Sequence, residues 1–453
     1  MKQYVQEKGG KIPVAGTADV IICGGGPAGF GAAIAAARNG VNALLIEKYG
    51  FLGGMATAGL VGPFMSCYTG EQRIIRGIFE ELVNSLVQAG AAVDPKYVRA
   101  ETGYSGFVPE EEHHAHVTPF DPEYLKYEMM EMALKAGVHL LFHSLVVGVI
   151  QDDDRIQGVV VENKSGRQVY MAKILIDTTG DGDVAFYAGV PYEKGRPLDG
   201  LLQSASIMFR LGGVNFEGVE QYMQKNPEDV YFRSLTRHPK LKNEYISTRD
   251  DILFFFLPRK GEVIVNCTRV LNIDGTNVND LTRGEIEGRQ QAMTLLRFFQ
   301  RYLPGFSNSY LLDMGAQIGI RETRRILGRY LLTKDDLLSY REFPDRIARA
   351  AYMVDIHNPT GPGWEAIPIR EGKSYTIPYS SLLPKTPSNL LVAGRCISAT
   401  HVAQSAIRVM PICMAIGQAA GTAAGIAVKQ GKGIVEIDIG RLQSVLRDNN
   451  VVL

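Results

Sequence analysis

Cysteine is scarce in this sequence, with five residues in a chain of 453, and no two of them form a C-x-x-C pair. Without such pairs, a redox dithiol, a zinc site, an iron–sulfur cluster and a disulfide framework are all disfavoured. We therefore expect no metal site. Cysteines without a disulfide pattern are typical of a reducing compartment, which favours a cytoplasmic location.

Net charge is absent as well, because 48 Lys and Arg residues balance 48 Asp and Glu residues. Since no basic field attracts polyanions, we expect neither a nucleic-acid partner nor a membrane partner. Residues 1–16 lack the apolar core of a signal peptide. The most apolar run, Pro411–Val428, has only 18 residues and contains Gln418, so we interpret it as a buried helix and not as a membrane span.

What the sequence does have is a glycine turn near its start. A short β-branched run precedes glycines at G-x-G-x-x-G spacing, and a helical pattern follows them. Gly24 allows the tight turn, Gly26 lets the backbone approach a pyrophosphate, and Gly29 lets the helix pack on the strand. Pro27 and Ala28 begin the helix, whose N-terminus faces the phosphates.

An acidic residue closes the second predicted strand. Residues 43–46 are apolar, and Glu47 follows them, 18 residues past Gly29. In dinucleotide-binding folds, an acid at about this distance bonds the ribose 2′-hydroxyl. Its charge would repel a 2′-phosphate, so the sequence disfavours NADP and favours FAD or NAD.

A glycine pair follows this acid and opens the loop Gly53-Gly54-Met-Ala-Thr. Here the sequence resembles the FAD-dependent oxidoreductases with a glutathione-reductase-type FAD fold. The loop is similar to one in the fumarate reductase and succinate dehydrogenase flavoproteins, where it lies beside the flavin. The resemblance implies FAD as cofactor, and we assign Lys48, Gly53, Gly54 and Met55 to its site.

A further predicted strand ends in Thr178-Thr-Gly-Asp. This end resembles the Ala-Thr-Gly-Asp strand end of the same superfamily, with threonine in place of the usual alanine. Small residues there let the strand end approach the cofactor. The resemblance implies that Thr179, Gly180 and Asp181 lie at the FAD site, and that Val147 makes a backbone contact with adenine.

Near the other end of the chain, an apolar strand leads into Gly394-Arg395 and then into a helix rich in Gly and Ala. This segment resembles the second FAD-binding segment of the superfamily, which lies along the ribityl chain and points a helix N-terminus at the flavin. Such a helix dipole stabilises the negative charge of the reduced ring. The resemblance implies a cofactor role for Gly394, Arg395, Ser398, Pro411 and Ile412.

The middle of the chain holds an arginine-rich run at residues 319–328, Gly-Ile-Arg-Glu-Thr-Arg-Arg-Ile-Leu-Gly. It is similar to a signature of a broad FAD-dependent oxidoreductase family. If the run is a strand, Arg321, Thr323 and Arg325 share one face, which could present cations to a substrate carboxylate or to reduced flavin. An ion-pair cluster at a domain junction is an equal alternative.

Two histidines join Arg321 as candidate catalytic residues. His357 follows a predicted strand and precedes a turn, where its side chain would reach a cleft. His401 lies six residues after Arg395, near the flavin if that segment is. We assign His357, His401 and Arg321 to proton transfer and to contacts with substrate or flavin. Cys67 or His401 could also carry a covalent flavin bond, although nothing in the spacing requires one.

Three acids and three histidines crowd residues 110–116. His113, His114 and His116 could bind a metal, but such runs are more often solvated loops, and we favour a solvated loop. A lid over the substrate is an alternative role for the segment.

Apolar spacing predicts the other elements. Helices are expected over 72–91, 121–136 with Asp121 as N-cap, and 282–303; strands are expected within 139–150, 158–162, 169–171, 205–211, 252–257 and 263–270, the last two joined by a hairpin turn at Pro258–Gly261.

These patterns predict an α/β fold: a Rossmann-like FAD-binding domain, with a parallel sheet and a β-meander, and an inserted α+β substrate domain. The predicted FAD-binding domain comprises residues 14–192 and 381–435, the insertion 193–380, and a C-terminal helix and tail 436–453. The predicted function is that of an FAD-dependent oxidoreductase, which transfers a hydride between flavin N5 and an unknown small-molecule substrate.

Two other functions stay open at this point, together with a homo-oligomeric state. An NAD-dependent dehydrogenase would use the first glycine turn but leaves the closing Gly-Arg segment without a role. A flavin-bearing electron-transfer subunit generally passes electrons to iron–sulfur clusters, and the cysteines here are too scattered to bind one, although a partner could supply it.

Overall fold

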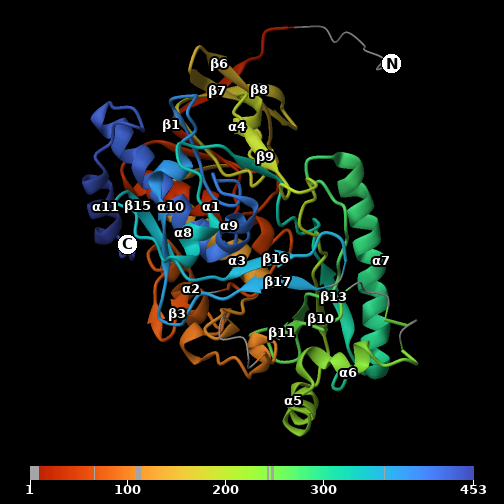
Figure 1. Ribbon diagram of the computed structural model, residues 1–453. Helices are drawn as coiled ribbons and strands as arrows, with labels where there is room; N and C mark the ends of the chain where they lie inside the picture. The colour runs from red at the N-terminus through yellow and green to blue at the C-terminus, as the bar shows by residue number, and fades with distance from the viewer. Residues whose placement is uncertain (1–9, 66, 109–113, 242–243, 246–248, 362) are drawn as a thin grey trace.

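The computed structural model describes residues 10–65, 67–108, 114–241, 244–245, 249–361 and 363–453. A seven-stranded sheet and a four-stranded sheet form the two centres of the architecture. The first and last parts of the chain, red and blue in Figure 1, build the half around the larger sheet, and the green middle part builds the other half.

The seven-stranded sheet has the order β5-β2-β1-β8-β7-β6, with β19 also paired to β8. Its strands are β1 (Val14–Cys23), β2 (Ala43–Ile46), β5 (His139–Leu141), β6 (Leu145–Asp152), β7 (Arg155–Asn163), β8 (Gly166–Asp177) and β19 (Leu390–Val392). The β5–β2, β2–β1, β1–β8 and β8–β19 pairs are parallel, whereas β6, β7 and the first half of β8 form an antiparallel meander. The predicted α/β fold class is confirmed.

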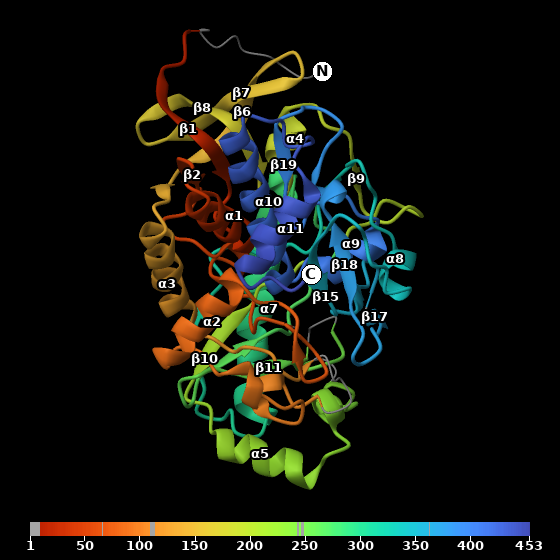
Figure 2. The same ribbon diagram turned by 90° about the vertical axis from the view of Figure 1, so that its left-hand side faces the viewer.

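Two helices from opposite ends of the chain, α1 (Pro27–Arg38) and α10 (Met410–Gln430), pack against each other beside this sheet. Figure 2 shows them side by side, α1 in red and α10 in blue. A Cβ atom on Gly417 would lie 1.9 Å from the carbonyl oxygen of Ala28, and one on Gly421 would lie 2.0 Å from that of Ala32. Glycine is required at both positions because the backbone of α1 occupies that space.

Helix α10 contains the apolar run singled out in the sequence. Of the helices in the described parts of the chain, it is the one long and apolar enough to cross a membrane, and 94% of its most apolar stretch is buried inside the protein. The run is therefore a buried helix, as predicted.

The four-stranded sheet is antiparallel and lies in the half built by the middle of the chain. Its order is β11 (Phe254–Phe256), β12 (Val263–Val265), β10 (Phe209–Gly212) and β13 (Tyr310–Met314). The long helix α7 (Val278–Tyr302) shares an aromatic-rich core with these strands. The pairing of β11 with β12 confirms the predicted hairpin at Pro258–Gly261.

Short ladders and helices complete the chain. The ladders are β3 (Tyr68–Thr69) with β4 (Gln72–Arg73), β9 (Tyr192–Lys194) with β14 (Arg324–Ile326), β15 (Arg346–Ala350) with β18 (Tyr375–Pro378), and β16 (Val354–His357) with β17 (Trp364–Ile367). The remaining α-helices are α2 (Ile78–Gln88), α3 (Pro122–Lys135), α4 (Asp183–Tyr187), α5 (Phe216–Lys225), α6 (Arg233–Thr236), α8 (Lys334–Leu338), α9 (His401–Ile407) and α11 (Ile439–Asp448). The predicted domain boundaries stay predictions, and β9 runs across the one placed after residue 192.

One prediction of local structure is wrong, and the condition set on another does not hold. The helix expected over 72–91 begins only at Ile78, because the residues before it form the β3–β4 hairpin and its exit. The strand expected through Arg321 begins only at Arg324. Strand alternation therefore fails there, and Glu322 and Arg325, predicted on opposite faces, form an ion pair with each other.

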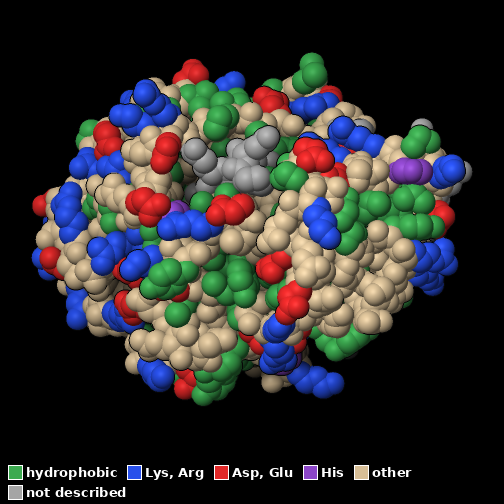
Figure 3. Space-filling view, turned by 90° about the horizontal axis from the view of Figure 1, so that it is seen from below, with side chains coloured by type: hydrophobic (Ala, Val, Ile, Leu, Met, Phe, Trp, Pro, Cys, Tyr) green, Lys and Arg blue, Asp and Glu red, His purple; other side chains and the backbone are tan. Residues whose placement is uncertain are grey.

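The surface mixes charges of both signs. On the face seen in Figure 3, Lys and Arg side chains lie interspersed with Asp and Glu side chains. This distribution agrees with the balanced composition of the chain, 48 residues of each sign. The expected lack of a nucleic-acid partner stays a prediction.

Candidate active site

The glycine turn at the end of β1 is held by backbone contacts that only glycine permits. Gly24 has φ +106°, and a Cβ on it would lie 2.5 Å from the carbonyl oxygen of Thr178. A Cβ on Gly29 would lie 1.8 Å from the Gly24 oxygen. Gly26 is the N-cap of α1 and, like any glycine, offers no side-chain cap, so the first N–H groups after Pro27 point outward without a side-chain partner. Such a helix end suits a phosphate group.

The Gly53–Gly54 loop packs directly on this turn. The Gly53 N–H donates a hydrogen bond to the Gly25 oxygen at 2.8 Å. A Cβ on Gly54 would lie 2.8 Å from Gly26 Cα, and both loop glycines have positive φ, +109° and +51°. Met55, in the turn that follows, lines the cavity described below. The two glycine-rich stretches predicted to border the cofactor are thus in contact.

Glu47 is buried at the end of β2, where it supports the glycine turn. Its Oε2 accepts the Gly25 N–H at 2.6 Å, and its Oε1 accepts the Tyr49 N–H at 2.9 Å. Burial raises its pKa, and the backbone hydrogen bonds oppose that effect. Each carboxylate oxygen can accept a second hydrogen bond, which leaves acceptors for ribose hydroxyls.

The ends of β8 and β19 meet next to the same turn. The Thr178 hydroxyl donates to the Cys23 and Gly24 oxygens. Asp181 accepts the Thr323 hydroxyl at 2.8 Å and pairs with Arg395 at 2.7 Å. Arg395 Nη1 is buried and has no hydrogen-bond partner among the described residues, a state that a bound ligand would relieve.

The start of α10 completes this arrangement. A Cβ on Gly394 would lie 2.9 Å from Ala28 Cβ, which places the end of β19 against the start of α1. Helix α10 begins at Met410, with Pro411 and Ile412 in its first turn and no side-chain cap. Free helix N–H groups, an unpartnered guanidinium nitrogen and a glycine cradle are a donor set that fits the anionic phosphates and flavin ring of FAD.

Of the remaining predicted cofactor residues, Thr179 and Gly180 lie beside the glycine turn and Arg395, whereas Val147, Lys48 and Ser398 lie elsewhere. Thr179 donates from its N–H and its hydroxyl to Asp177, and Gly180 has φ +81° beside Arg395. Val147 is the extra residue of a β-bulge in β6, which takes its backbone out of the regular ladder. Lys48 is exposed, and Ser398 is buried outside the cavity lining described below.

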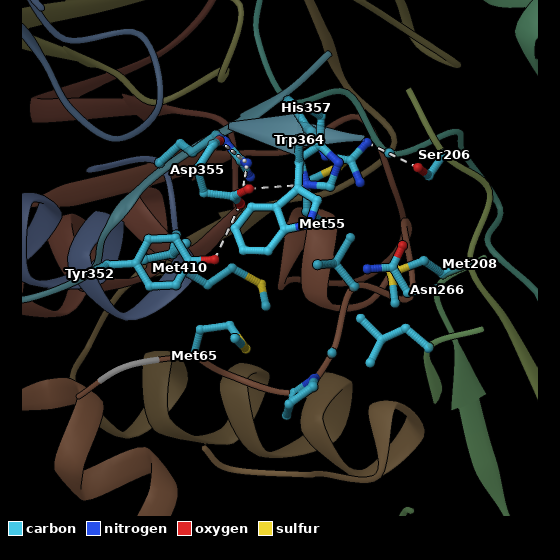
Figure 4. Close-up of a pocket in the computed structure, with 18 of the residues that line it drawn as sticks. Met55, Met65, Ser206, Met208, Asn266, Tyr352, Asp355, His357, Trp364 and Met410 are labelled. Carbon is cyan, nitrogen blue, oxygen red and sulfur yellow. Dashed lines mark hydrogen bonds and ion pairs between the residues drawn. The ribbon is translucent and has the colours of Figure 1, made fainter. Parts of the chain in front are cut away.

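A cavity opens where these elements face the four-stranded sheet and the β16–β17 hairpin. It is lined by Met55, Val61, Gly62, Pro63, Met65, His114, Ser206, Met208, Tyr231, Arg249, Leu253, Phe255, Asn266, Gly319, Ile320, Arg321, Tyr352, Met353, Asp355, His357, Trp364, Arg395, Arg408, Val409 and Met410. Figure 4 shows the Trp364 indole projecting into it beside His357, with Tyr352 and Met410 also reaching inward. Most of the wall is apolar, and one group of its polar side chains centres on Asp355 and His357 of β16.

Asp355 organises those polar groups (Figure 4). His357 Nε2 lies 3.4 Å from Asp355 Oδ1, Arg408 Nη2 lies 2.9 Å from Oδ2, and the Tyr352 hydroxyl donates to Oδ2 at 3.2 Å. Burial opposes the charge on Asp355, yet His357 and the arginines hold its pKa below that of an ordinary carboxyl. Burial, followed by Arg321, lowers the pKa of His357 to about 3, so its ring is neutral at neutral pH.

Arg321 reaches the cavity from the irregular stretch before β14. Its Nη1 donates to the Ser204 oxygen at 2.6 Å and to the Ser206 hydroxyl at 2.9 Å. Burial and then the charge of Arg408 lower its pKa. Arg321 and His357, two of the three candidate catalytic residues, therefore line one cavity.

The third candidate, His401, belongs to a different network. Its Nδ1 lies 2.9 Å from Glu322 Oε1, and the same carboxylate pairs with Arg325. All three side chains are buried, and none of them lines the cavity. The catalytic role of His401 stays a prediction, and its contacts describe a residue that fixes α9 to the stretch before β14.

Residues 110–113 of the histidine-rich loop lie outside the described residues, and in the described part, residues 114–116, the two histidines are not solvated as we favoured. His114 and His116 are only 5% and 6% exposed, and His114 lines the cavity. The Nδ1 atoms bond to the carbonyl oxygens of Ser105 and Pro95. Among the described residues no cluster of possible ligands could hold a metal ion, and His113 lies outside them. Cys67 is buried beyond the cavity lining, and burial raises its pKa to about 12.

Sequence reasoning missed three residues that shape the site, namely Asp355, Arg408 and Trp364. Asp355 lies two residues before His357 on one strand, and that spacing puts both side chains on one face. Trp364 is the single tryptophan of the chain and the cross-strand partner of His357. Arg408 lies at the join between α9 and α10, and no local pattern signals its pairing with Asp355.

Comparison with known proteins supplies a family and a relative. A model of a family described as FAD dependent oxidoreductase matches residues 19–446. The digeranylgeranylglycerophospholipid reductase of Methanocaldococcus jannaschii is 28% identical over 185 residues, which are 40% of this chain and 42% of that protein. The match therefore spans less than half of the relative.

Two solved structures are similar over most of the chain. A geranylgeranyl bacteriochlorophyll reductase-like protein of Thermoplasma acidophilum is 14% identical with a TM-score of 0.44, and the match covers 95% of this chain and 83% of that one. The p-nitrophenol 4-monooxygenase of Pseudomonas putida is 13% identical with a TM-score of 0.46, over 92% and 81% of the two chains. Neither value supports an inference about activity.

Proposed function

From the premise that this chain belongs to the FAD-dependent oxidoreductase family, we propose that it transfers a hydride between FAD and a small organic substrate held in the cavity. When bound, FAD supplies the flavin N5 position that accepts or donates the hydride. The Gly-Gly-Met-Ala-Thr loop supports a closer relation to the fumarate reductase flavoproteins within this group.

The residues proposed to hold FAD come from both ends of the chain. The N–H groups at the start of α1 would bind the pyrophosphate, and Glu47 the ribose hydroxyls. The start of α10 and Arg395 would lie at the flavin ring, where a helix dipole and a cation stabilise negative charge. The contact between α1 and α10, with the cavity beside the start of α10, is the observation that carries this proposal.

His357 is proposed to handle the proton that accompanies the hydride. Nε2 faces Asp355 Oδ1 at 3.4 Å, so Nδ1 is the ring nitrogen that we propose to face the substrate proton. Tyr352 and Arg408 hold the Asp355 carboxylate in place, so the ring keeps one orientation. Met and aromatic side chains line the cavity around the His357 ring and would keep water from the reacting atoms.

The test uses purified protein, freed of cofactor and titrated with FAD. We expect a yellow complex and quenching of Trp364 fluorescence, because the single tryptophan lies in the cavity next to the proposed flavin position. A mixed library of organic acids and alcohols, added without oxygen, should then bleach the flavin absorbance. A protein that stays colourless with added FAD, or quenching that NAD produces equally well, would contradict the proposal.

A further inference from the structure

Arg321 brings a half-buried cation to the cavity, and no described carboxylate forms an ion pair with it. Its guanidinium contacts the neutral Ser204 oxygen and Ser206 hydroxyl, and no described carboxylate lies within 4.0 Å of it. The side chain is half-buried in the wall of the cavity. Burying a charge is costly unless an opposite charge accompanies it, so this site is incomplete without an anion.

Neighbouring charges strengthen that requirement. Arg395 pairs with Asp181, and Arg408 pairs with Asp355, so the carboxylates near the cavity are already engaged. The charges of Arg408, Arg269 and Arg249 add to the positive potential at Arg321, and the charge of Asp355 offsets part of it. Arg269 itself bonds to the carbonyl oxygens of Gly361 and Gly363, at the tip of the β16–β17 hairpin, rather than to a carboxylate. The positive field at this spot is therefore left for a ligand.

The rest of the wall is suited to a large apolar group. Five of the fourteen methionines line it: Met55, Met65, Met208, Met353 and Met410. Aromatic side chains of Tyr352, Phe255 and Trp364 face the same space. Flexible thioethers and flat rings pack against apolar or aromatic bodies of variable shape.

We propose that the substrate is an organic monocarboxylate with a large apolar body, its carboxylate bound by Arg321 and its body held among the methionines and Trp364. The inference rests on the proposed function, since it names the substrate class of the same site. A guanidinium binds a carboxylate through paired, charge-assisted hydrogen bonds. One unpaired cation provides for one carboxylate, so small dicarboxylates are disfavoured.

Trp364 makes the test direct, because it is the only tryptophan in the chain and it lies in the cavity. Its fluorescence, excited at 295 nm, reports ligand binding without turnover. The probes are 3-phenylpropanoate, the matched neutral 3-phenylpropanamide, and acetate, each titrated into FAD-loaded and FAD-free protein. We expect 3-phenylpropanoate to bind at least tenfold more tightly than the other two. If the amide bound equally well, the claim that the site binds a carboxylate would be overturned. If acetate bound equally well, the claim that the site binds a large apolar body would be overturned.

Variants then assign the contact to Arg321. Arg321→Met should weaken 3-phenylpropanoate binding by about 30-fold, the range expected for lost charge-assisted hydrogen bonds, and leave the amide unchanged. Arg321→Lys should keep part of the affinity, and Arg447→Met, an exposed arginine on α11, should keep all of it. The inference would be overturned if Arg321→Met bound 3-phenylpropanoate as tightly as wild type. It would also be overturned if Arg321→Met lost its affinity for FAD but kept its affinity for 3-phenylpropanoate. Failure of wild-type protein to bind FAD overturns the proposed function instead, and the FAD-free titration distinguishes the two.

Discussion

At the scale of single residues, the candidate site depends on buried charges whose partners are fixed. Glu47, Asp177 and Asp355 are buried carboxylates that accept several hydrogen bonds, and Arg321 is a half-buried cation. A buried carboxylate is stable only while those donors stay in place, so each such residue ties neighbouring segments together. Substitutions at these positions therefore affect ligand binding and stability in separable ways.

Glu47→Gln should weaken FAD binding by about 10- to 100-fold while the protein still folds. The amide keeps the shape of the side chain but can accept at only one of its two ends, so Gly25 or Tyr49 loses its acceptor and the ribose loses a charged partner. Fluorescence titration of FAD into cofactor-free protein measures the dissociation constant.

The matched control is Glu128→Gln, another buried glutamate, which accepts the Ser85 hydroxyl between α2 and α3. It should leave FAD affinity unchanged. Equal loss of affinity in both variants would argue against a ribose role for Glu47.

Asp177→Asn should remove part of the pH dependence of stability. Burial raises the pKa of Asp177 to about 6, against about 3.9 in an unfolded chain. Its contribution to stability is therefore greatest below the unfolded pKa and falls as the pH rises through 6. The free energy of unfolding of wild type relative to Asp177→Asn should fall by about 2 kcal/mol between pH 4 and pH 7. Urea unfolding at several pH values measures it, and parallel curves for the two proteins would refute the shift.

At the scale of elements, the contact of α1 with α10 decides whether a cofactor cradle exists. Neither helix is strongly amphipathic, since both are buried along most of their length. Their glycines let the backbones approach closely, and that approach sets the start of α10 beside the start of α1. The same packing places Gly394 against α1, because a Cβ atom added to Gly394 would lie 2.9 Å from Ala28 Cβ.

Gly417→Ala should destabilise the protein by about 3 kcal/mol and weaken FAD binding, because the added methyl group would lie 1.9 Å from the Ala28 oxygen and push the two helices apart. Chemical unfolding and FAD titration measure the two effects. Gly433→Ala, just past α10, meets only the flexible Glu436 side chain and should change stability by less than about 0.5 kcal/mol. Similar losses in both variants would show that the helix contact is not the cause.

The elements themselves were predicted with mixed success. Asp121 caps α3 as expected, by accepting from the Glu123 and Tyr124 N–H groups, because an N-cap is a local interaction visible in sequence. Of the two alternatives for the arginine-rich run, a strand through Arg321 does not form, and contacts between distant segments give Arg324 and Arg325 ion pairs instead. Arg324 turns toward Asp181 and Asp183, while Arg325 turns toward Glu322.

At the scale of the whole molecule, FAD is expected to contact residues from both ends of the chain and thereby to stabilise the folded state. A ligand that binds only the folded state stabilises it by about 2.7 kcal/mol at a concentration 100 times its dissociation constant. With the unfolding entropy typical of a chain of 453 residues, this raises Tm by about 3 °C. Differential scanning fluorimetry with and without FAD measures the shift, and Glu47→Gln should show less of it at the same FAD concentration. An unchanged Tm for wild type would contradict binding across the two ends.

The sequence by itself determined the parts of the site that are local. The glycine turn, the acid after β2, the Gly53–Gly54 loop and the closing Gly-Arg segment each depend on a few neighbouring residues, whose steric and hydrogen-bonding needs can be read from spacing. These segments predicted the α/β fold and FAD as cofactor. The tertiary structure alone decided which side chains share the cavity: it joined Arg321 with His357, separated His401 from them, and added Asp355, Arg408 and Trp364. The reason is physical, since pairing between buried charges depends on the distance between segments far apart in the chain, and that distance is fixed only when the core packs.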